Sequence, residues 1–149
     1  MPPLTNTLLD RRWDSDYLTL SELLKKGTLG RVVEFETHFD RHRPEIDLRK
    51  GWKNKPAPGG GVVYDLGSHL MDQVVATYGL PKRITGFIGT QREGNTTGVD
   101  DSCTILLHYD GLLATVKAGV VSPEGNQLRY WIRGTKGSFK KVRLQSTPQ

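Results

Sequence analysis

The chain has 149 residues, of which 36% are hydrophobic and 25% are charged. This composition is typical of one soluble, globular domain that is long enough to bury a core and too short for two. No apolar run approaches the roughly 18 residues that a membrane helix needs, so no membrane contact is expected. The start of the chain lacks a secretory signal pattern, and a single cysteine excludes an internal disulfide framework. We therefore expect a cytoplasmic protein.

The net charge of +5 raises the question of nucleic-acid binding. The basic residues are spread over the whole chain, and acidic residues such as Glu34, Glu36 and Asp100 lie between them. No zinc-finger spacing, helix-turn-helix signal or aromatic RNA-binding strand accompanies the charge. Scattered charge of this kind is typical of a solvated surface, so the sequence predicts no nucleic-acid partner.

The first predicted element is a helix from about Ser15 to Lys26. Asp14 offers a cap at its start, leucines supply an apolar stripe, and Gly27 suits the left-handed position after its last turn. After Gly30 the apolar period changes to two, and residues 33–39 alternate as in a strand with one solvated face. Residues 45–61 are rich in proline and glycine and are predicted to form a long loop.

A second helix is predicted from about Val62 to Tyr78, and the glycine and proline that follow stop it. Most of the remaining chain alternates as strands do, and Asp110-Gly111 is a two-residue hairpin signal between two of them. The predicted strands cover residues 84–90, 102–109, 112–120 and 128–133, and a last basic strand follows Gly137.

This order of elements predicts an α+β domain with an open-faced, largely antiparallel mixed sheet and helices packed on one face. It lacks the regular strand-helix alternation of a nucleotide-binding fold. We expect one domain over residues 1–149, with residues from about 10 to 145 ordered. A face without helices is suited to contact with another subunit or a ligand. The residues predicted to occupy it are Glu34, Glu36, His38, Arg129 and Trp131.

The residues best suited to chemistry lie in the second predicted helix, just after the glycines at 59–61. Asp65, His69 and Asp72 stand at i, i+4 and i+7, so they are predicted to project from nearly the same side. A carboxylate one turn from an imidazole orients the ring and raises its basicity, and an imidazole suits proton removal from an alcohol near neutral pH. Gly67 is unfavourable inside a helix, so close packing or ligand access is expected there.

The same residues also fit plainer roles. Asp65 in the first turn of a helix is favourable through the helix dipole alone, and His69 is compatible with a structural histidine. No further histidine or cysteine nearby completes a ligand set, so the sequence predicts no metal site. Arg12 fits either a polyol-binding residue or an ion-pair partner of an aspartate. Cys103 alternates with core residues and is expected to be an inert thiol.

Three segments carry a family resemblance: residues 11–16 (Arg-Arg-Trp-Asp-Ser-Asp), the strand within residues 32–43, and residues 59–72. They resemble the C-terminal domain of the glucose–fructose oxidoreductase / inositol dehydrogenase (Gfo/Idh/MocA) family. The resemblance runs from about Asp10 to Lys140, and its most specific part is the glycine run followed by residues 65–69 (Asp-Leu-Gly-Ser-His). It implies an open-faced mixed sheet backed by helices, whose free face forms contacts in a homo-oligomer.

The resemblance also implies a function. The chain would be the substrate-binding and catalytic domain of an NAD- or NADP-dependent oxidoreductase that acts on a sugar, inositol or related polyol. In that family an aspartate and a histidine in this arrangement lie beside the substrate carbon and the nicotinamide. Asp65 would modulate the site, His69 would take the hydroxyl proton, and Arg12 would lie in a segment that lines substrate pockets.

Two departures from the family pattern qualify this expectation. The family's N-terminal nucleotide-binding domain, with its glycine-rich phosphate loop, is missing, so no activity is expected from the isolated chain. Lys55-Pro56 does not supply that domain's Glu-Lys-Pro motif, because Asn54 stands in place of the glutamate. The second departure is that the chain is expected to stop earlier than the family domain, and residues 1–9 and 142–149 do not resemble it. The alternative function is a non-catalytic dimerisation or ligand-sensing module derived from this fold.

Overall fold

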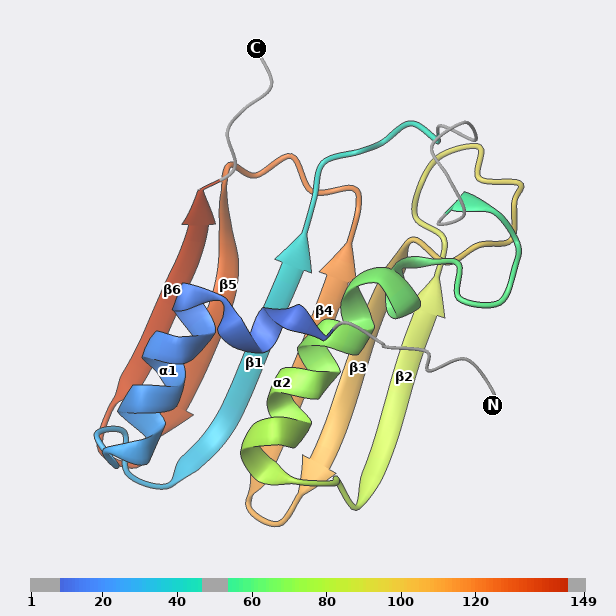
Figure 1. Cartoon of the computed structure of the whole chain (residues 1–149). Helices are drawn as coiled ribbons and strands as arrows, with labels where there is room; N and C mark the ends of the chain where they lie inside the picture. The colour runs from blue at the N-terminus through green and yellow to red at the C-terminus, as the bar shows by residue number, and fades with distance from the viewer. Residues whose placement is uncertain (1–8, 47–53, 145–149) are drawn as a thin grey trace, which may run out of the picture.

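A computed structural model describes residues 9–46 and 54–144, and these residues build a mixed sheet of six strands (Figure 1). The order across the sheet is β2-β3-β4-β1-β5-β6. β1 and β4 are parallel, and every other neighbouring pair is antiparallel. This arrangement confirms the predicted α+β class with a largely antiparallel mixed sheet. The strands are β1 (Val32–Asp40), β2 (Arg83–Gly89), β3 (Ser102–Tyr109), β4 (Leu112–Gly119), β5 (Asn126–Gly134) and β6 (Ser138–Leu144).

The predicted hairpin at Asp110-Gly111 joins β3 to β4, with Tyr109 opposite Leu112. Gly111 has a φ of 68°, a left-handed conformation that glycine adopts without a steric penalty. The other predicted strands agree with the observed ones to within a few residues. The predicted loop at 45–61 and the lead-in and tail of the chain lie partly outside the described residues. No helix in the described ranges is both long and apolar enough to span a membrane.

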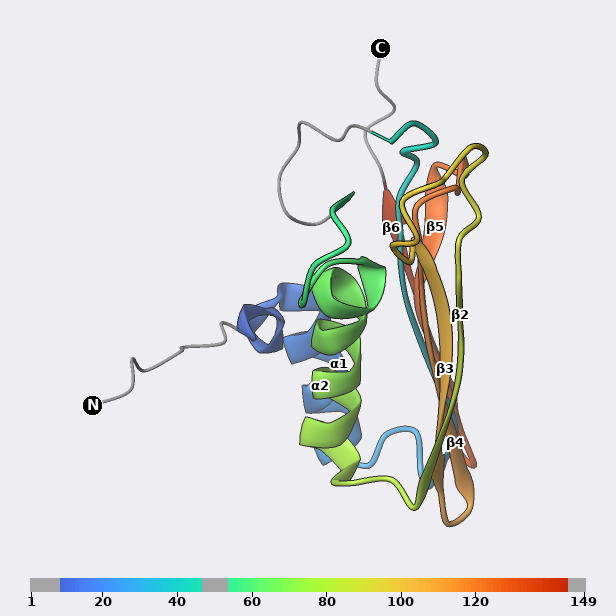
Figure 2. The same cartoon turned by 90° about the vertical axis from the view of Figure 1, so that its right-hand side faces the viewer.

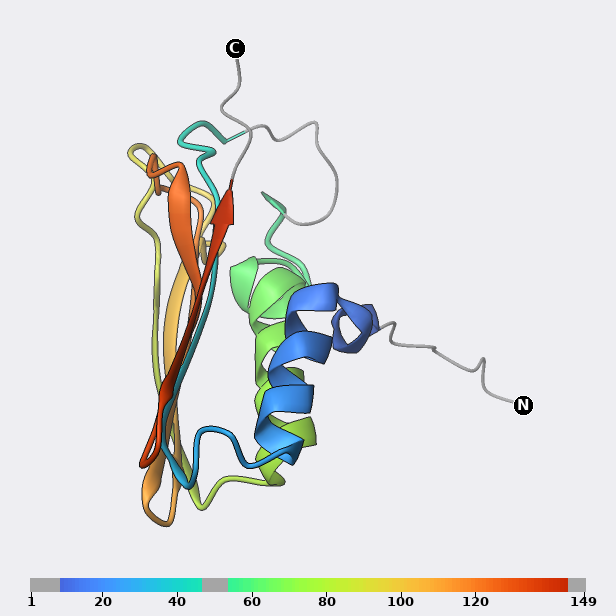
Figure 3. The ribbon, with the colours of Figure 1, turned by 90° about the vertical axis from the view of Figure 1, so that its left-hand side faces the viewer.

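Two helices, α1 (Ser15–Lys25) and α2 (Ser68–Tyr78), cover one face of the sheet and leave the other open (Figures 2 and 3). The core lies between helices and sheet, because alternate residues of the central strands point toward the helices. Leu20 from α1, Leu70 and Val74 from α2, and Phe35 from β1 are fully buried there. Glu34, Glu36, His38 and Trp131 belong to the alternate set on the open face, as predicted.

Arg129 is not on the open face, and that part of the prediction is wrong. The β5–β6 register shifts between Leu128 and Tyr130, so a β-bulge adds one residue to β5. The extra residue turns both Arg129 and Tyr130 toward the helices, where Arg129 is only 2% exposed. Strict alternation placed Arg129 on the wrong face because Leu128 is apolar although it lies on the open face, so the apolar period has no visible break through 128, 130 and 132.

The buried guanidinium of Arg129 connects three elements. Its Nε donates to the carboxylate of Asp16 on α1 at 3.0 Å, and Nη1 donates to the hydroxyl of Thr37 on β1 at 2.7 Å. Nη2 donates to the side-chain oxygen of Gln73 on α2 at 3.1 Å, and the Tyr130 hydroxyl donates to the same oxygen at 2.8 Å. Since every one of these groups is buried or nearly so, each depends on the others for its hydrogen bonds.

The predicted second helix is present, but its first part is a π-helix. Val63–Gly67 form this π turn, and α2 follows without a break. Asp100 holds its start: the carbonyl accepts the N–H of Val62 at 3.1 Å, and the carboxylate accepts the N–H of Val63 at 2.8 Å. Single π turns inside helices are often found at functional sites.

Two glycines flank this turn for different reasons. Gly61 has a φ of 93°, and a Cβ there would collide with the carboxylate of Asp100. Gly67 has ordinary helical angles (φ −58°, ψ −39°), and a Cβ would meet its nearest neighbour, the Sγ of Cys103, at 3.7 Å. Gly61 is therefore required by its surroundings, whereas Gly67 leaves room for a methyl group.

We predict opposite effects for the two alanine substitutions. Gly61→Ala should lower the free energy of unfolding by more than about 1 kcal/mol, because the residue is strained and displaces Asp100. Gly67→Ala should leave it unchanged or raise it by up to about 1 kcal/mol, since alanine is the better helix former. Urea unfolding followed by circular dichroism measures both. Equal destabilisation by the two changes would contradict this account.

We further predict that Arg129→Ala lowers the free energy of unfolding by about 3 kcal/mol or more, because it leaves buried partners without a donor. The matched control is Arg133→Ala in the same strand. Its guanidinium pairs with Glu34 at 3.0 Å but is 57% exposed, so its loss should cost less than about 1 kcal/mol. Comparable losses for both variants, measured by urea unfolding, would refute the structural role of Arg129.

Candidate functional site

A short 3-10 helix, η1 (Asp10–Trp13), lies over α2, and three successive residues of η1 contact it. The carbonyl of Arg11 accepts a hydrogen bond from the side chain of Gln73 at 2.6 Å. Arg12 forms a two-pronged ion pair with Asp72, and an oxygen of Asp10 lies 4.0 Å from Nδ1 of His69. The α2 partners are spaced i, i+3 and i+4, so they share one side of the helix.

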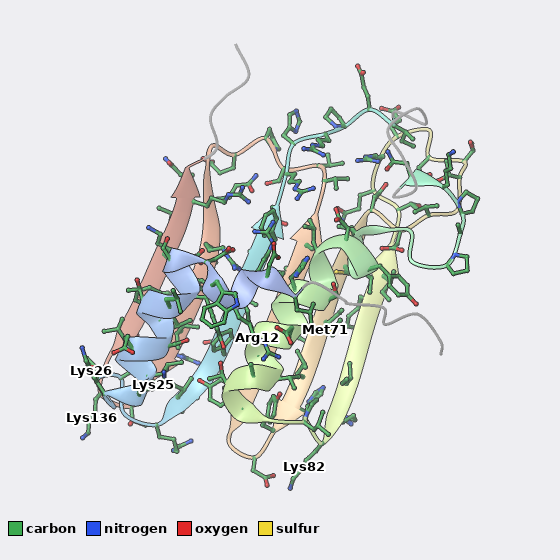
Figure 4. The ribbon with its side chains drawn as sticks, in the orientation of Figure 1. Arg12, Lys25, Lys26, Met71, Lys82 and Lys136 are labelled. Carbon is green, nitrogen blue, oxygen red and sulfur yellow. The ribbon has the colours of Figure 1, made fainter. Side chains whose placement is uncertain are left out.

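Arg12, predicted to bind substrate, is held mainly by Asp72. Its Nε and Nη2 donate to the two carboxylate oxygens at 2.7 and 2.6 Å. The hydrogen bond and the charge of Asp72 raise the pKa of Arg12. The side chain reaches over α2, on which Met71 is also labelled in Figure 4, and it remains 49% exposed. It is thus oriented by an ion pair and still accessible to a ligand.

His69 stands with most of its ring covered, because its side chain is 19% exposed. Its Nδ1 is buried, and no group in the described ranges makes a hydrogen bond to it. The carboxylate of Asp10 is the ion-pair partner nearest to that nitrogen, at 4.0 Å. Sequence reasoning did not find Asp10, since it precedes the first helix and belongs to no periodic pattern.

Asp65 lies in the π turn, and its carboxylate faces Arg41, with 3.5 Å between Oδ2 and Nη1. A π-helix closes i→i+5 hydrogen bonds, so α-helical spacing does not hold through this segment. The structure places His69 and Asp72 beside η1 and places Asp65 beside the residue that follows β1. The two predicted residues therefore have different neighbours, and His69 is not among the residues that line the cavity beside Asp65.

Asp65 also lines the main cavity, which has a volume of about 780 Å³. The cavity lies where β1 and β4 end and the π turn begins, at the upper edge of the sheet in Figure 1. Its lining mixes arginines with carboxylates, a composition suited to a polar ligand with several hydroxyl groups. The lining residues are Arg41, His42, Arg43, Pro44, Glu45, Asn54, Gly61, Val62, Asp65, Leu66, Arg92, Asp100, Asp101 and Val120.

Two carboxylates of this lining are engaged by the protein itself. Asp100 caps the π turn, and its close approach explains the glycine at 61. Asp101 is 3% exposed and accepts hydrogen bonds from the N–H of Gln91 at 2.6 Å and from the side chain of Asn95 at 2.9 Å. These two acids therefore shape the loops around the cavity.

The remaining sequence candidates lie outside this region or at its edge. Burial raises the pKa of the Cys103 thiol to about 11, which agrees with the predicted inert thiol. His38 lies on the open face, with Nε2 2.8 Å from Glu36 and Nδ1 3.2 Å from Asp40. Burial raises the pKa of Glu36, but hydrogen bonds from Lys117 and His38 outweigh it and leave a lowered value. His42 is exposed and lines the cavity.

The described residues contain no cluster of three or more histidine, cysteine or acidic side chains that fits a metal ion. Nor does a glycine-rich turn lead directly from a strand into a helix within these ranges, as a dinucleotide pyrophosphate site requires. This part of the chain does not fit the main binding site of a nicotinamide nucleotide.

Comparison with known proteins gives a consistent match. Residues 17–140 match the family model of the GFO/IDH/MocA C-terminal domain. An uncharacterized oxidoreductase of Schizosaccharomyces pombe is 41% identical over 138 residues, which cover 89% of this chain and 37% of that protein. The scyllo-inositol 2-dehydrogenase (NADP(+)) IolW of Bacillus subtilis is 37% identical over 132 residues, which cover 89% of this chain and 36% of IolW.

Solved structures share the fold. The structure of yvaA from Bacillus subtilis has a TM-score of 0.83 and 35% identity, and the match covers 91% of this chain and 37% of yvaA. An oxidoreductase from Bacillus cereus has a TM-score of 0.74 and 30% identity, with coverage of 88% and 42%. The chain spans little more than a third of the length of the curated relatives it matches. Together, the fold and the match over residues 17–140 show that the chain belongs to the Gfo/Idh/MocA oxidoreductase family, as its C-terminal domain.

Proposed function

We propose that the chain is the substrate-side, catalytic domain of an NAD(P)-dependent oxidoreductase that acts on a sugar, inositol or related polyol. The observation that carries this proposal is the environment of His69: a mostly covered imidazole, with Nδ1 buried toward Asp10, beside a half-exposed arginine. A polar cavity is lined by the carboxylate of Asp65, four residues before His69 in the chain. The relative IolW, which is named for the oxidation of scyllo-inositol, supports a polyol as the substrate.

In the proposed reaction His69 acts as the general base. Because Nδ1 is buried, Nε2 is the nitrogen that takes the proton of the substrate hydroxyl. A small approach of Asp10 would let its carboxylate accept the Nδ1 proton, which would orient the ring and stabilise its protonated form. Arg12, oriented by Asp72, would donate hydrogen bonds to neighbouring hydroxyls, and Asp65 would modulate the charge of the cavity.

The rest of the reaction needs a domain that holds the nucleotide. The nicotinamide supplies the hydride acceptor when it is bound. The described residues provide the proton acceptor and the hydroxyl-binding groups, and they exclude water from one side of the imidazole.

We also propose that the protein is cytoplasmic. A chain whose single cysteine is buried and forms no disulfide suits the reducing cytoplasm.

The second candidate function is a non-catalytic dimerisation or ligand-sensing module. The absence of a dinucleotide site from the described residues favours it. Retention of both Asp65 and His69, together with the buried Nδ1 beside Asp10, favours the catalytic function. The two candidates differ in one measurable property, which is turnover once a nucleotide-binding domain is supplied.

We predict that His69→Gln, in this chain joined to a family nucleotide-binding domain, lowers kcat for polyol oxidation by about 100-fold or more, as expected for loss of a general base. His108→Gln, near the end of β3, is the control and should keep the wild-type kcat. Unchanged turnover in His69→Gln would rule out the assignment and favour the non-catalytic module.

We also propose that the open sheet face forms a homo-oligomer contact. Alternate residues of β3 and β4, including Leu106 and Leu113, project from this face beside Trp131 and the Glu36–His38–Lys117 group. No helix in the described ranges covers these side chains (Figure 2). A broad face that carries aliphatic and aromatic groups is suited to burial against a second copy.

A charge in the middle of that face should prevent association. We predict that Leu106→Glu converts the oligomer to a monomer, because a desolvated carboxylate has no partner there. Sedimentation velocity measures the mass of both forms. Leu18→Glu, at a 44% exposed position on α1, is the control and should keep the wild-type mass. A wild-type chain that is already monomeric, or an unchanged mass in Leu106→Glu, would refute this interface.

A further inference from the structure

Four arginine side chains surround the ring of Phe39 at the end of β1. The guanidinium carbons of Arg143, Arg11 and Arg41 lie 4.4, 4.5 and 5.0 Å from the ring centroid, and that of Arg129 lies at 5.9 Å. Phe39 itself is only 4% exposed. The four arginines come from η1, the residue after β1, β5 and β6, so only the tertiary fold brings them together.

The carboxylates near this cluster do not form ion pairs with all four arginines. Arg129 pairs with Asp16 at 3.0 Å, and Arg11 pairs with Asp14 at 3.1 Å. Arg41 has a longer contact with Asp65, at 3.5 Å. Arg143 pairs with no carboxylate in the described ranges, although it stands on the same ring as the others. The cluster therefore holds one more positive charge than its acidic neighbours offset.

The cations of this cluster also act on one another. Burial lowers the pKa of Arg41, and the charge of Asp65 raises it. The charges of Arg43, Arg11 and Arg143 lower it further, and the net shift is downward. Like charges gathered beside a low-dielectric wall create a positive potential that attracts an anion. Guanidinium groups bind carboxylate and phosphate oxygens in two-pronged geometry, which makes them the preferred side chains for this task.

The cluster adjoins the candidate site. Arg41 belongs to both, since it contacts Phe39, lines the main cavity and approaches Asp65. Arg11 belongs to η1, which also carries the contact to His69. A ligand whose charged group sits at Arg41 would therefore occupy the main cavity beside Asp65.

We propose that the substrate is an anionic polyol, a sugar acid or sugar phosphate, whose carboxylate or phosphate binds Arg41, Arg143 and Arg11. This inference rests on the proposed oxidoreductase function and narrows its substrate class. An alternative role for Arg143 is to keep the edge strand β6 from pairing with another chain. This role explains why Arg143 is exposed, as it does for Lys140 and Lys141. That role does not explain why Arg143 converges with Arg11 and Arg41 on one buried ring.

The test compares three ligands with one carbon skeleton: D-glucitol, D-gluconate and D-glucitol 6-phosphate. Their binding to this chain is measured by calorimetry at low salt. We expect at least one of the two anions to bind about tenfold or more tightly than D-glucitol, as a charge-assisted arginine contact allows. In Arg143→Gln this preference should shrink by a similar factor. Arg133→Gln, an exposed arginine of β5, is the matched control and should retain it.

Several outcomes would overturn the proposal. They are equal affinity for the three ligands, no binding of either anion, and a preference that survives both Arg143→Gln and Arg41→Gln. The phosphates of the nucleotide are another source of the same chemistry, and ADP-ribose is the probe for them. Competition in which ADP-ribose displaces both anions at lower concentration would assign the cluster to the nucleotide and refute an anionic substrate.

Failure of the proposed function has a different signature. In that case this chain joined to a nucleotide-binding domain would oxidise none of the three ligands with NAD or NADP, whatever their affinities. If the joined protein oxidises D-glucitol with the same kcat/KM as the anions, the oxidoreductase function stands and the anionic substrate class is refuted. Circular dichroism of each arginine variant confirms that a loss of binding is not a loss of fold.

Discussion

The buried guanidinium of Arg129 is the contact through which the helices and the sheet hold one another in place. It reaches Asp16 on α1, Thr37 on β1 and Gln73 on α2, and it lies 4.2 Å from the ring of Tyr130. A buried cation of this kind is stable only when each donor finds an acceptor. Within the hydrophobic core that joins helices and sheet, one polar side chain therefore contacts both helices and a central strand, and a bulge in β5 turns it inward.

The hydrogen bonds around Arg129 also position the candidate site. Gln73 accepts from Arg129 through its side-chain oxygen and donates from its amide nitrogen to the carbonyl of Arg11. The network thus continues into η1, which brings Asp10 to His69 and Arg12 to Asp72. A short helix of four residues has little stability of its own, so these contacts decide where it lies. The imidazole and its surroundings are consequently supported by the most buried polar groups in the described structure.

Membership of the Gfo/Idh/MocA family and the local geometry of the site bear on different questions, the type of reaction and the type of ligand. The family match supports an oxidoreductase but does not choose among hydroxylated substrates. The charges around Phe39 are a property of this chain that the family match does not specify. Four arginines gather there, and three of them pair with aspartates. Arg41 connects the cluster to the cavity, since it lies over the ring of Phe39 and contacts Asp65.

Much of the fold could be read from local patterns. Alternation predicted the strands, an apolar stripe with end signals predicted both helices, and Asp110-Gly111 predicted its hairpin, since each of these signals lies within a few neighbouring residues. The site was found in part: residues 65–72 stood out by spacing, and the resemblance to a family suggested their chemistry.

The tertiary structure decided the rest. Hydrophobic period cannot reveal the bulge that buries Arg129, because one inserted residue changes the face of a side chain without changing the composition. Spacing likewise cannot reveal a π turn whose first residue, Val63, is capped by Asp100, 37 positions further along the chain. The contact of Asp10 with His69 and the gathering of arginines on Phe39 join segments far apart in sequence. The sequence by itself determined which elements form, since local propensity governs them, and only packing between distant segments determined which charges meet.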